Sequence, residues 1–408
     1  MAAESSGAGG AIAGPDAALA LALFTCGVIK RPLPALSRKL APERLWALAP
    51  DELAAHFKLT RLERERLRAF RAGFSPAHER QALSRRGIEF AALGQEGYPP
   101  ALAQIFDPPA GIFVIGGGAA GPLARLRELV AGRRIAVVGA RAASRYGLDA
   151  AGQLAGALAG SGVCICSGLA FGVDAAAHRA AIGSAGATMA VLGCGPERIY
   201  PRANAALYRK ILKSDVIMSE YPPGTTPLPW RFPARNRIIA GLSEGVIVVE
   251  AREKSGALIT ADFCLEQGKE VFAVPGSIFS ELSAGPHQLI RSGAVPVTRP
   301  EDVFEALGIE PPADRTEAGS PPLGEDEARL YRQLAADFRH LDQLAAGAGL
   351  DSGAAAGALV SLEIKGLARH DPGRGYARSG QAFKGAPGDQ CSGWRAARPG
   401  SEMRGGKG

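Results

Sequence analysis

A chain of 408 residues is long enough for two or three domains with a large hydrophobic core. Its formal net charge of +7 favours an anionic partner. Six cysteines without paired CxxC spacing exclude a zinc ribbon and a disulfide framework. The N-terminus has no basic leader, and the apolar run at residues 17–24 is too short to span a bilayer. We therefore expect a cytoplasmic protein with no membrane partner.

The charge is unevenly distributed along the chain. It is +4 over residues 1–131, +6 over 132–300, −8 over 301–371 and +5 over 372–408. A polyanion should therefore bind the middle of the chain or its tail, and the 301–371 segment should repel it.

The first part of the chain predicts a small helical domain. Residues 1–15 are small and Gly-rich, and we expect them to be disordered. Over residues 16–92, apolar side chains recur at spacings of three and four, which is typical of short amphipathic helices. The basic segment from Arg61 to Arg71 is interpreted as a solvated helix face rather than a DNA-binding helix.

Residues 93–307 alternate between short apolar runs and helical segments. A connector with one short strand at Ile112 to Ile115 comes first, and each later run is followed by a helix. This alternation predicts an extended Rossmann-like α/β fold, in which a doubly wound, mainly parallel sheet is covered on both faces. The predicted strands lie at residues 135–140, 163–168, 188–195, 216–221, 246–251 and 271–276.

The C-terminal part of the sequence predicts a linker, a small domain and a tail. Residues 308–324 are rich in Pro, Gly and acidic residues, which indicates a linker. Residues 325–377 predict three helices and a hairpin, the order of a winged-helix domain. Its third helix, Ser352 to Leu362, has no Arg, Lys, Asn or Gln to read base edges, so we expect this domain to bind protein or another copy of itself. Residues 378–408 form a basic, low-complexity tail that we expect to be disordered.

The segment FPARNRIIAGLS, Phe232 to Ser243, carries the strongest functional signal. Arg235, Asn236 and Arg237 stand at the expected start of a helix, where free backbone N–H groups and the helix dipole favour a phosphate. A core helix with solvated arginines is the alternative interpretation of this segment alone.

Similar turns end the other predicted strands, where ligands bind in this kind of fold. The first turn departs from the GxGxxG pattern because Arg141 replaces the second glycine, which argues against NAD. The candidate DNA-binding residues of this turn are Gly139, Arg141, Ser144 and Arg145.

The second turn contains Gly168 and Gly172, which permit a tight turn with exposed N–H groups. Asp174 is interpreted as a helix cap and His178 as a helix residue, and acid–base chemistry between them is the weaker alternative. Two further turns add candidate DNA-binding residues, namely Arg202, Asn204, Lys254 and Ser255.

These turns carry cations without a Ser-His-Asp triad, a metal cluster or a clear catalytic pair. Glu220 and Glu250 are interpreted as partners that orient the arginines. Tyr146, Phe171 and Phe232 are either core residues or platforms for base stacking. A row of phosphate-binding turns without a catalytic centre favours a groove that follows a phosphodiester backbone, and we expect no cofactor.

Together these residues resemble the DNA processing protein A family (DprA, also called Smf) over about residues 16–377. The resemblance rests on VVGARAASRYG, SGLAFGVDAAAH, GCGPERIYPRAN, SEYPPGTTPLPWRFPARNRIIAGLS, VVEAREKSGALITA and VFAVPG, which occur in the order and spacing of the family. It implies a SAM- or HhH-like helical N-terminal domain, a Rossmann-like domain and a winged helix. It also implies DNA contacts by the residues that match Arg141, Arg202 and Arg235 to Arg237.

The resemblance implies a protein that is not an enzyme. It would bind single-stranded DNA, protect incoming DNA in natural transformation, load the RecA recombinase and form a homodimer through the Rossmann-like domain. One alternative is a nucleotide phosphoribohydrolase of the related Rossmann-like superfamily, although SGALIT replaces the PGGxGT turn of those enzymes. The other alternative is a double-stranded DNA regulator that acts through the winged helix.

Overall fold

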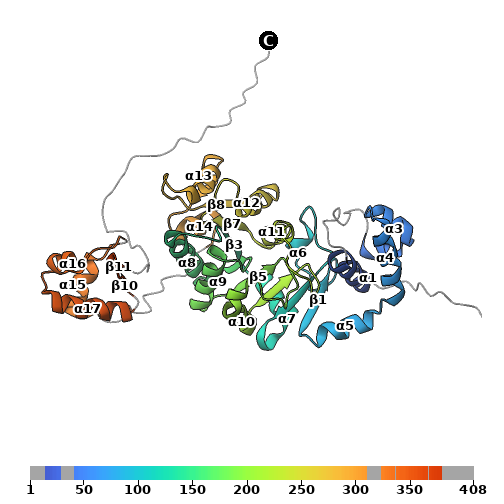
Figure 1. The fold of residues 1–408 in the computed structure, drawn as a ribbon, viewed down its shortest axis with the longest axis horizontal. Coiled ribbons are helices and arrows are strands. Elements are labelled where there is room, and N and C mark those ends of the chain that lie inside the picture. Colours follow the sequence, from blue (N-terminus) through green and yellow to red (C-terminus); the bar gives the residue numbers. More distant parts are fainter. Residues whose placement is uncertain (1–13, 29–40, 310–322, 336, 366, 379–408) are drawn as a thin grey trace, which may run out of the picture. The chain divides into compact units, whose positions relative to one another are not determined.

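The computed structural model describes residues 14–28, 41–309, 323–335, 337–365 and 367–378. The chain divides into two compact units near residue 318, and each is described by itself (Figure 1). Most of the predicted disordered N-terminus and linker and nearly all of the predicted basic tail lie outside the described residues. Gly14 and Pro15, expected to be disordered, instead begin a helix.

The chain begins with short helices that pack around their own apolar core. The arginines of α4 mostly bind their own domain: Arg68 pairs with Asp51 at 2.7 Å, and Arg71 donates to the carbonyl of Leu48 at 2.7 Å. These contacts agree with a structural role for the basic segment. The helices are α1 (Gly14–Ala22), the π-helix η1 (Leu23–Val28), α2 (Pro42–Ala47), α3 (Pro50–His56), α4 (Arg61–Gly73) and α5 (Pro76–Ser84).

A nine-stranded sheet forms the centre of the first unit. Its strand order is β1-β2-β6-β5-β4-β3-β7-β8-β9. The pairs that β2 makes with β1 and β6 are antiparallel, and all other pairs are parallel. The strands are β1 (Ile88–Ala92), β2 (Gly111–Gly116), β3 (Arg134–Val138), β4 (Cys164–Ser167), β5 (Thr188–Leu192), β6 (Val216–Ser219), β7 (Gly245–Val248), β8 (Glu270–Ala273) and β9 (Val295–Pro296).

Strand β1 corrects one expectation from the sequence, which extended the helical pattern to about Phe90. Ile88 and Glu89 instead pair with Ile115 and Val114 of β2. The sheet therefore begins at Ile88, ahead of the boundary expected after residue 92. A five-residue strand at the end of a helical region has too few alternating positions to be distinguished from a helix end.

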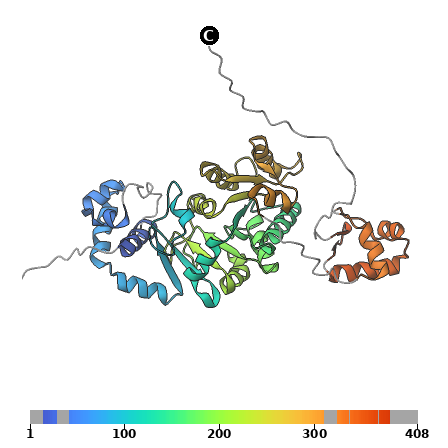
Figure 2. The same cartoon turned by 180° about the vertical axis from the view of Figure 1, so that it is seen from behind.

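Helices cover both faces of the sheet because successive residues of each buried strand point to opposite sides. Along β3, Ala136 and Val138 pack in one apolar cluster, and Ile135 and Val137 pack in the other. Figure 2 shows the same layers from behind. On one face lie α6 (Pro100–Ala103), α7 (Pro122–Ala131), α11 (Arg231–Leu242), α12 (Gly256–Glu266) and α13 (Ala284–Arg291), and on the other lie α8 (Arg145–Gly160), α9 (Val173–Gly183), α10 (Ala205–Ser214) and α14 (Pro300–Leu307).

Short 3₁₀ helices occur in the connections of this unit. They are η2 (Gly118–Ala120), η3 (Arg202–Asn204) and η4 (Glu281–Ser283). None of the helices in the described parts of the chain is long and apolar enough to cross a membrane.

The second unit is a winged helix with its own core of leucines and alanines. Buried Glu327 links the first helix of this unit to the end of the third. Its carboxylate accepts from Lys365 Nζ at 2.6 Å and from Ser361 Oγ at 2.5 Å. Val360 and Ile364 are exposed on that third helix. The unit consists of α15 (Glu325–Gln333), α16 (Leu341–Ala348), α17 (Ser352–Ile364), β10 (Ala368–Asp371) and β11 (Gly375–Arg378).

Candidate nucleic-acid interface

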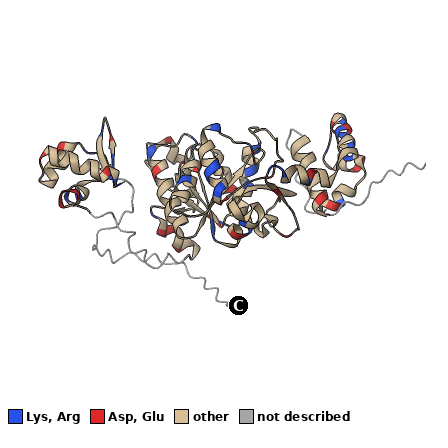
Figure 3. Cartoon of the chain, turned by 90° about the horizontal axis from the view of Figure 1, so that it is seen from below, with Lys and Arg blue, Asp and Glu red and all other residues tan. Residues whose placement is uncertain are grey.

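The loops that follow the parallel strands meet at the carboxyl edge of the sheet. After β3, the chain runs through β4, β5 and β6 on one side, and β7, β8 and β9 lie on the other. The edge between β3 and β7 is thus the point at which the strand order reverses, where doubly wound sheets bind their ligands. Figure 3 shows Lys and Arg interspersed with Asp and Glu over this unit.

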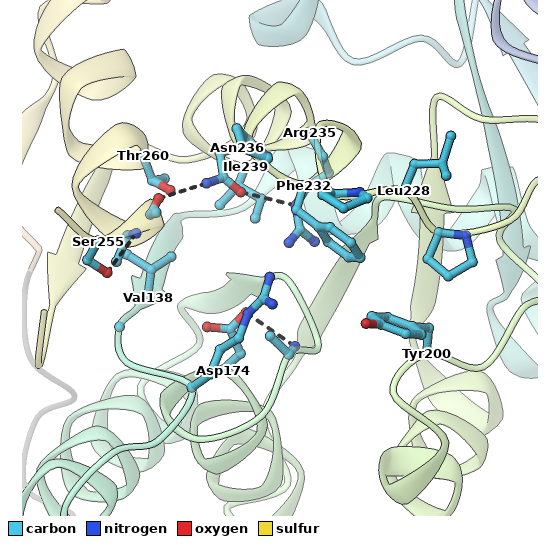
Figure 4. Close-up of a pocket in the computed structure, with 18 residues that line it drawn as sticks. Val138, Asp174, Tyr200, Leu228, Phe232, Arg235, Asn236, Ile239, Ser255 and Thr260 are labelled. Carbon is cyan, nitrogen blue, oxygen red and sulfur yellow. Dashed lines mark hydrogen bonds between the residues drawn. The ribbon is translucent and has the colours of Figure 1, made fainter. Parts of the chain in front are cut away.

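A cavity of about 410 Å³ opens at this edge. It is bounded by the loops after β3, β4, β5 and β6, by the start of α11 and by the start of α12. Figure 4 shows Arg235, Phe232, Tyr200 and Asp174 around it. Five of the candidate residues line it, namely Gly139, Arg141, Arg235, Asn236 and Ser255.

Helix α11 begins earlier than the sequence indicated. It starts at Arg231, after an N-cap at Trp230, so Arg235 and Arg237 lie beyond the first turn. The expectation that two guanidinium groups flank free N–H groups in the first turn was therefore wrong. The two arginines reach the sheet edge from within the helix, and their side chains point to different surroundings.

Arg235 is buried in the wall of the cavity, with 4% of its surface exposed. Its Nη1 donates to the carbonyl of Gly168 at 3.0 Å and to that of Val191, and its Nε donates to Asn236 Oδ1 at 3.2 Å. Burial lowers the pKa of Arg235, and the nearby Asp174 opposes this shift. A guanidinium held by two carbonyls retains its full charge for an anion in the cavity.

Two glycines allow this close packing. A Cβ on Gly168 would lie 2.4 Å from Nη2 of Arg235. Gly172 has φ of +71°, and a Cβ there would lie 2.2 Å from the carbonyl oxygen of Ala140. The glycines predicted to expose N–H groups thus make room for a buried cation and for the neighbouring loop.

Asp174 and His178 have structural partners. The Oδ2 of Asp174 accepts from the N–H groups of Gly168 and Ala170 at 3.1 and 3.3 Å. His178 is fully buried, its Nδ1 lies 2.7 Å from the hydroxyl of Thr188, and burial lowers its pKa to about 3. His178 is thus a buried helix residue, as expected, and its lowered pKa disfavours acid–base chemistry with Asp174. The expectation that Asp174 caps α9 was wrong, because the N-cap is Gly172 and Asp174 lies inside the helix and binds the loop before it.

Glu250 occupies the position where a bound phosphate would be expected in this kind of fold, at the N-terminus of α8. Its carboxylate accepts from Ser144 N at 2.8 Å and from Ser144 Oγ at 2.5 Å. The expectation that Glu250 orients an arginine was wrong, whereas Glu220 does pair with Arg237 at 2.7 Å. The carboxylate fills the anion site of α8, which supports the argument against NAD.

The mouth of the cavity carries a stack of a cation and two aromatic rings. The guanidinium of exposed Arg141 lies 5.1 Å from the ring centroid of Phe232, and that ring lies 5.4 Å from the ring of Tyr200. Tyr200 is 40% exposed. We missed Tyr200 in the sequence, although it precedes Pro201 in the same turn as Arg202. Such a surface can bind a base by stacking and a phosphate by charge.

Thr260 is a second residue that the sequence did not reveal. It lines the cavity, is buried, and its Oγ1 has no hydrogen-bond partner among the residues that the structure describes. A buried hydroxyl without a partner is a group that a ligand can satisfy.

The remaining candidates lie around the cavity or away from it. Asn204 is buried and donates to the carbonyls of Leu169 and Ala170, so it fixes the loop after β4. Arg202 and Lys254 are exposed on the rim, and Arg145 is exposed beside Asp149 at 3.1 Å. Ser144 caps α8 by accepting from Gly147 N at 3.1 Å.

Arg237 lies outside this cavity. It pairs with Glu220 and Asp107, and these carboxylates raise its pKa. It lines a separate cavity of about 780 Å³ together with Phe106 and Lys269. This geometry gives Arg237 a supporting role within the fold.

Comparison with known proteins identifies the family of the chain. The family model for DNA recombination-mediator protein A matches residues 89–308, and that for the DprA winged helix domain matches residues 310–374. The chain therefore belongs to the DNA processing protein A family, whose members are described as recombination mediators.

Individual relatives cover most of the chain. The DNA processing protein DprA of Bacillus subtilis is 45% identical over 226 residues, which are 55% of this chain and 73% of the relative. Protein Smf of Escherichia coli is 41% identical over 292 residues, which are 69% of this chain and 75% of the relative. The X-ray structure of DprA from Streptococcus pneumoniae matches with a TM-score of 0.56 and 37% identity, covering 64% of this chain and 87% of that one.

Proposed function

We propose that this protein is a recombination mediator that holds single-stranded DNA along the carboxyl edge of its sheet and performs no reaction on it. In this proposal it protects incoming DNA in natural transformation and loads RecA onto it, in the cytoplasm and as a homodimer. The resemblance to the family supports the interaction with RecA and the formation of a homodimer. The geometry of the cavity supports the binding of single-stranded DNA.

The observation that carries the proposal is the cavity with buried Arg235 in its wall and Arg141, Phe232 and Tyr200 at its mouth. A charge at the bottom and stacked rings at the entrance fit a chain of alternating phosphates and bases. Bases in a duplex are paired and stacked, so only an unpaired strand can offer them to such a site.

The candidate residues would divide the work according to their exposure. Arg141, Arg145, Arg202 and Lys254 would contact phosphates, and Arg235 would attract the phosphate nearest the cavity. Gly139, Asn236 and Ser255 would line the path of the strand. Gly168, Gly172, Ser144 and Asn204 would hold the loops in place, and Arg237 would support α11.

Binding of fluorescent oligo-dT to the Arg141→Ala variant tests the proposal. Because Arg141 is exposed and would form a charge-assisted hydrogen bond to a phosphate, its loss should weaken binding about tenfold. The slope of log K against log salt should also fall by about 0.7, since one phosphate is no longer neutralised.

The matched control is Arg209→Ala, which removes an exposed arginine from α10. Equal affinities for the two variants would remove Arg141 from the interface. A wild-type affinity that does not change with salt would contradict binding through phosphates altogether.

A nucleotide phosphoribohydrolase is the second candidate function, because the cavity has room for a nucleotide. Among the described residues that line it, Asp174 is the one carboxylate, and it accepts two amide hydrogens. Burial raises the pKa of Asp174, but its hydrogen bonds to the loop after β4 favour a structural role over acid–base work. Release of free base from nucleoside monophosphates would support the phosphoribohydrolase function and contradict the proposal of a mediator that performs no reaction.

A further inference from the structure

Two large apolar side chains stand exposed at the tip of the loop after β8. Ile278 is 81% exposed and Phe279 is 92% exposed. Single exposed apolar residues are common on protein surfaces, whereas two adjacent ones at the tip of a turn form one continuous apolar surface that a ligand can contact.

The turn that presents them is firmly held. Ser280 N donates to the carbonyl of Ser277 at 3.0 Å, which closes the turn, and Phe279 N donates to Ser277 Oγ at 3.2 Å. At its base, the hydroxyl of Tyr146 donates to the carbonyl of Pro275 at 2.5 Å. The exposed tip therefore rests on fixed backbone, which lowers the entropy lost when a ligand binds.

The tip lies on the same edge of the sheet as the cavity. Strand β7 separates β3 from β8, and neighbouring strands are about 4.8 Å apart, so the two loops are offset by about 10 Å. That offset equals roughly three steps of the 3.4 Å rise between nucleotides of one DNA strand. The loop after β7 lies between them and is tied to the β8 side, since Ala251 N donates to the carbonyl of Leu282 at 2.7 Å.

The surface around the tip carries charges of both signs. Arg252 pairs with Glu281 at 3.5 Å, and Glu253 stands beside Lys254. Apart from the phosphate contact proposed above for Lys254, the carboxylates here leave this part of the rim with little net attraction to phosphates. A contact made here must come from apolar surface and from the face of the aromatic ring.

We propose that Phe279, with Ile278 beside it, stacks on a base of the bound strand and extends the DNA path from the cavity across the β7 loop. This inference rests on the proposed function. Two side chains are too few for a protein interface, which buries about 800 Å² on each partner, but they match the size of one or two bases. Because the tip and the cavity lie along the same edge of the sheet, a single strand of DNA bound in the cavity can continue to the tip, and we infer that this strand is the ligand of the tip.

Three variants of Phe279 test the inference with oligo-dT long enough to reach past the cavity. Phe279→Ala should weaken binding about tenfold, the usual loss for one stacked base. Phe279→Trp should retain the wild-type affinity, and Phe279→Leu should fall between the two. Phe106→Ala is the matched control, since Phe106 is 72% exposed and lines the separate cavity.

Two further readouts distinguish stacking from other contacts. The Phe279→Ala loss should be the same at low and high salt, because stacking neutralises no phosphate. It should also disappear on a strand whose bases have been removed while its phosphates remain. A loss that persists on that base-free strand would overturn the inference.

The oligomeric state must be followed in parallel by sedimentation. If Phe279→Ala dissociates copies of the chain and loses DNA affinity only as a result, the tip is a contact between copies and the inference fails. If wild type binds oligo-dT and Phe279→Ala binds it equally well, the inference fails while the proposed function stands. If wild type does not bind oligo-dT, the proposed function itself fails.

Discussion

The close contact between Gly168 and Arg235 gives the most direct test of the site's construction. In Gly168→Ala, the new Cβ would lie 2.4 Å from Nη2, 2.6 Å from Nη1 and 2.7 Å from Cζ of Arg235. The guanidinium must retreat and weaken its hydrogen bonds to the carbonyls of Gly168 and Val191. Gly168 is not among the residues with positive φ, so an alanine is compatible with the backbone itself.

The expected effect is a loss of about 3 kcal/mol in the free energy of unfolding. If the guanidinium stays in place, overpacking costs about 1–3 kcal/mol, and if it retreats, the loss of one charged hydrogen bond costs about 1.5–3 kcal/mol, so either route reaches about 3 kcal/mol. A loss of about 3 kcal/mol corresponds to a fall in Tm of roughly 6–12 °C for a domain of this size. Calorimetry or thermal circular dichroism measures it, and oligo-dT affinity should fall as well.

Gly152→Ala is the matched control because a Cβ there meets nothing within 4 Å in the interior of α8. It should stabilise the protein by about 1 kcal/mol through helix propensity. In an Arg235→Ala background, the loss from Gly168→Ala should disappear, because the two side chains no longer meet. Equal stability of wild type and Gly168→Ala would refute the packing of Arg235 described above.

The two remaining predictions concern the winged helix. Deleting residues 325–377 should leave oligo-dT affinity unchanged, because the proposed interface lies in the first unit; lost affinity would place part of the interface in the winged helix. Bonds from Lys365, Ser361 and the Gly324 N–H lower the pKa of Glu327 from its ordinary 4.5 to about 2. Since the folded pKa is the lower one, the stability that Glu327 provides is present above about pH 4.5 and is lost as the pH falls toward 2. Glu327→Gln should flatten this part of the stability profile, and an unchanged acid transition of the winged helix would contradict the assignment.

The sequence predicted the sheet well because its inner strands are buried on both faces. Runs such as the one from Ile135 to Val138 are continuously apolar, and a helix follows each of them as the alternation predicted. The same reasoning missed β1, whose five residues alternate too briefly to show a period.

The burial of the arginines could not be read from the sequence. A positive charge usually indicates exposure, yet Arg235 and Arg237 are 4% and 9% exposed. Arg235 donates to the carbonyls of Gly168 and Val191, whereas Arg237 pairs with the carboxylates of Asp107 and Glu220. All four partners come from distant parts of the chain. Only the three-dimensional arrangement separates an arginine in the cavity wall from one that supports the fold.

The carboxylate of Glu250 has a consequence for competition among ligands. Free nucleotides carry the same bases and phosphates as a DNA strand. In this kind of fold, a dinucleotide normally binds most tightly through its phosphates at the N-terminus of the helix that corresponds to α8. With that position filled by a negative side chain, a small nucleotide in the proposed site would keep only the weak contacts of one base and one phosphate. A polymer would sum such contacts over several loops, so the proposed site would favour long chains over monomers without reading any base.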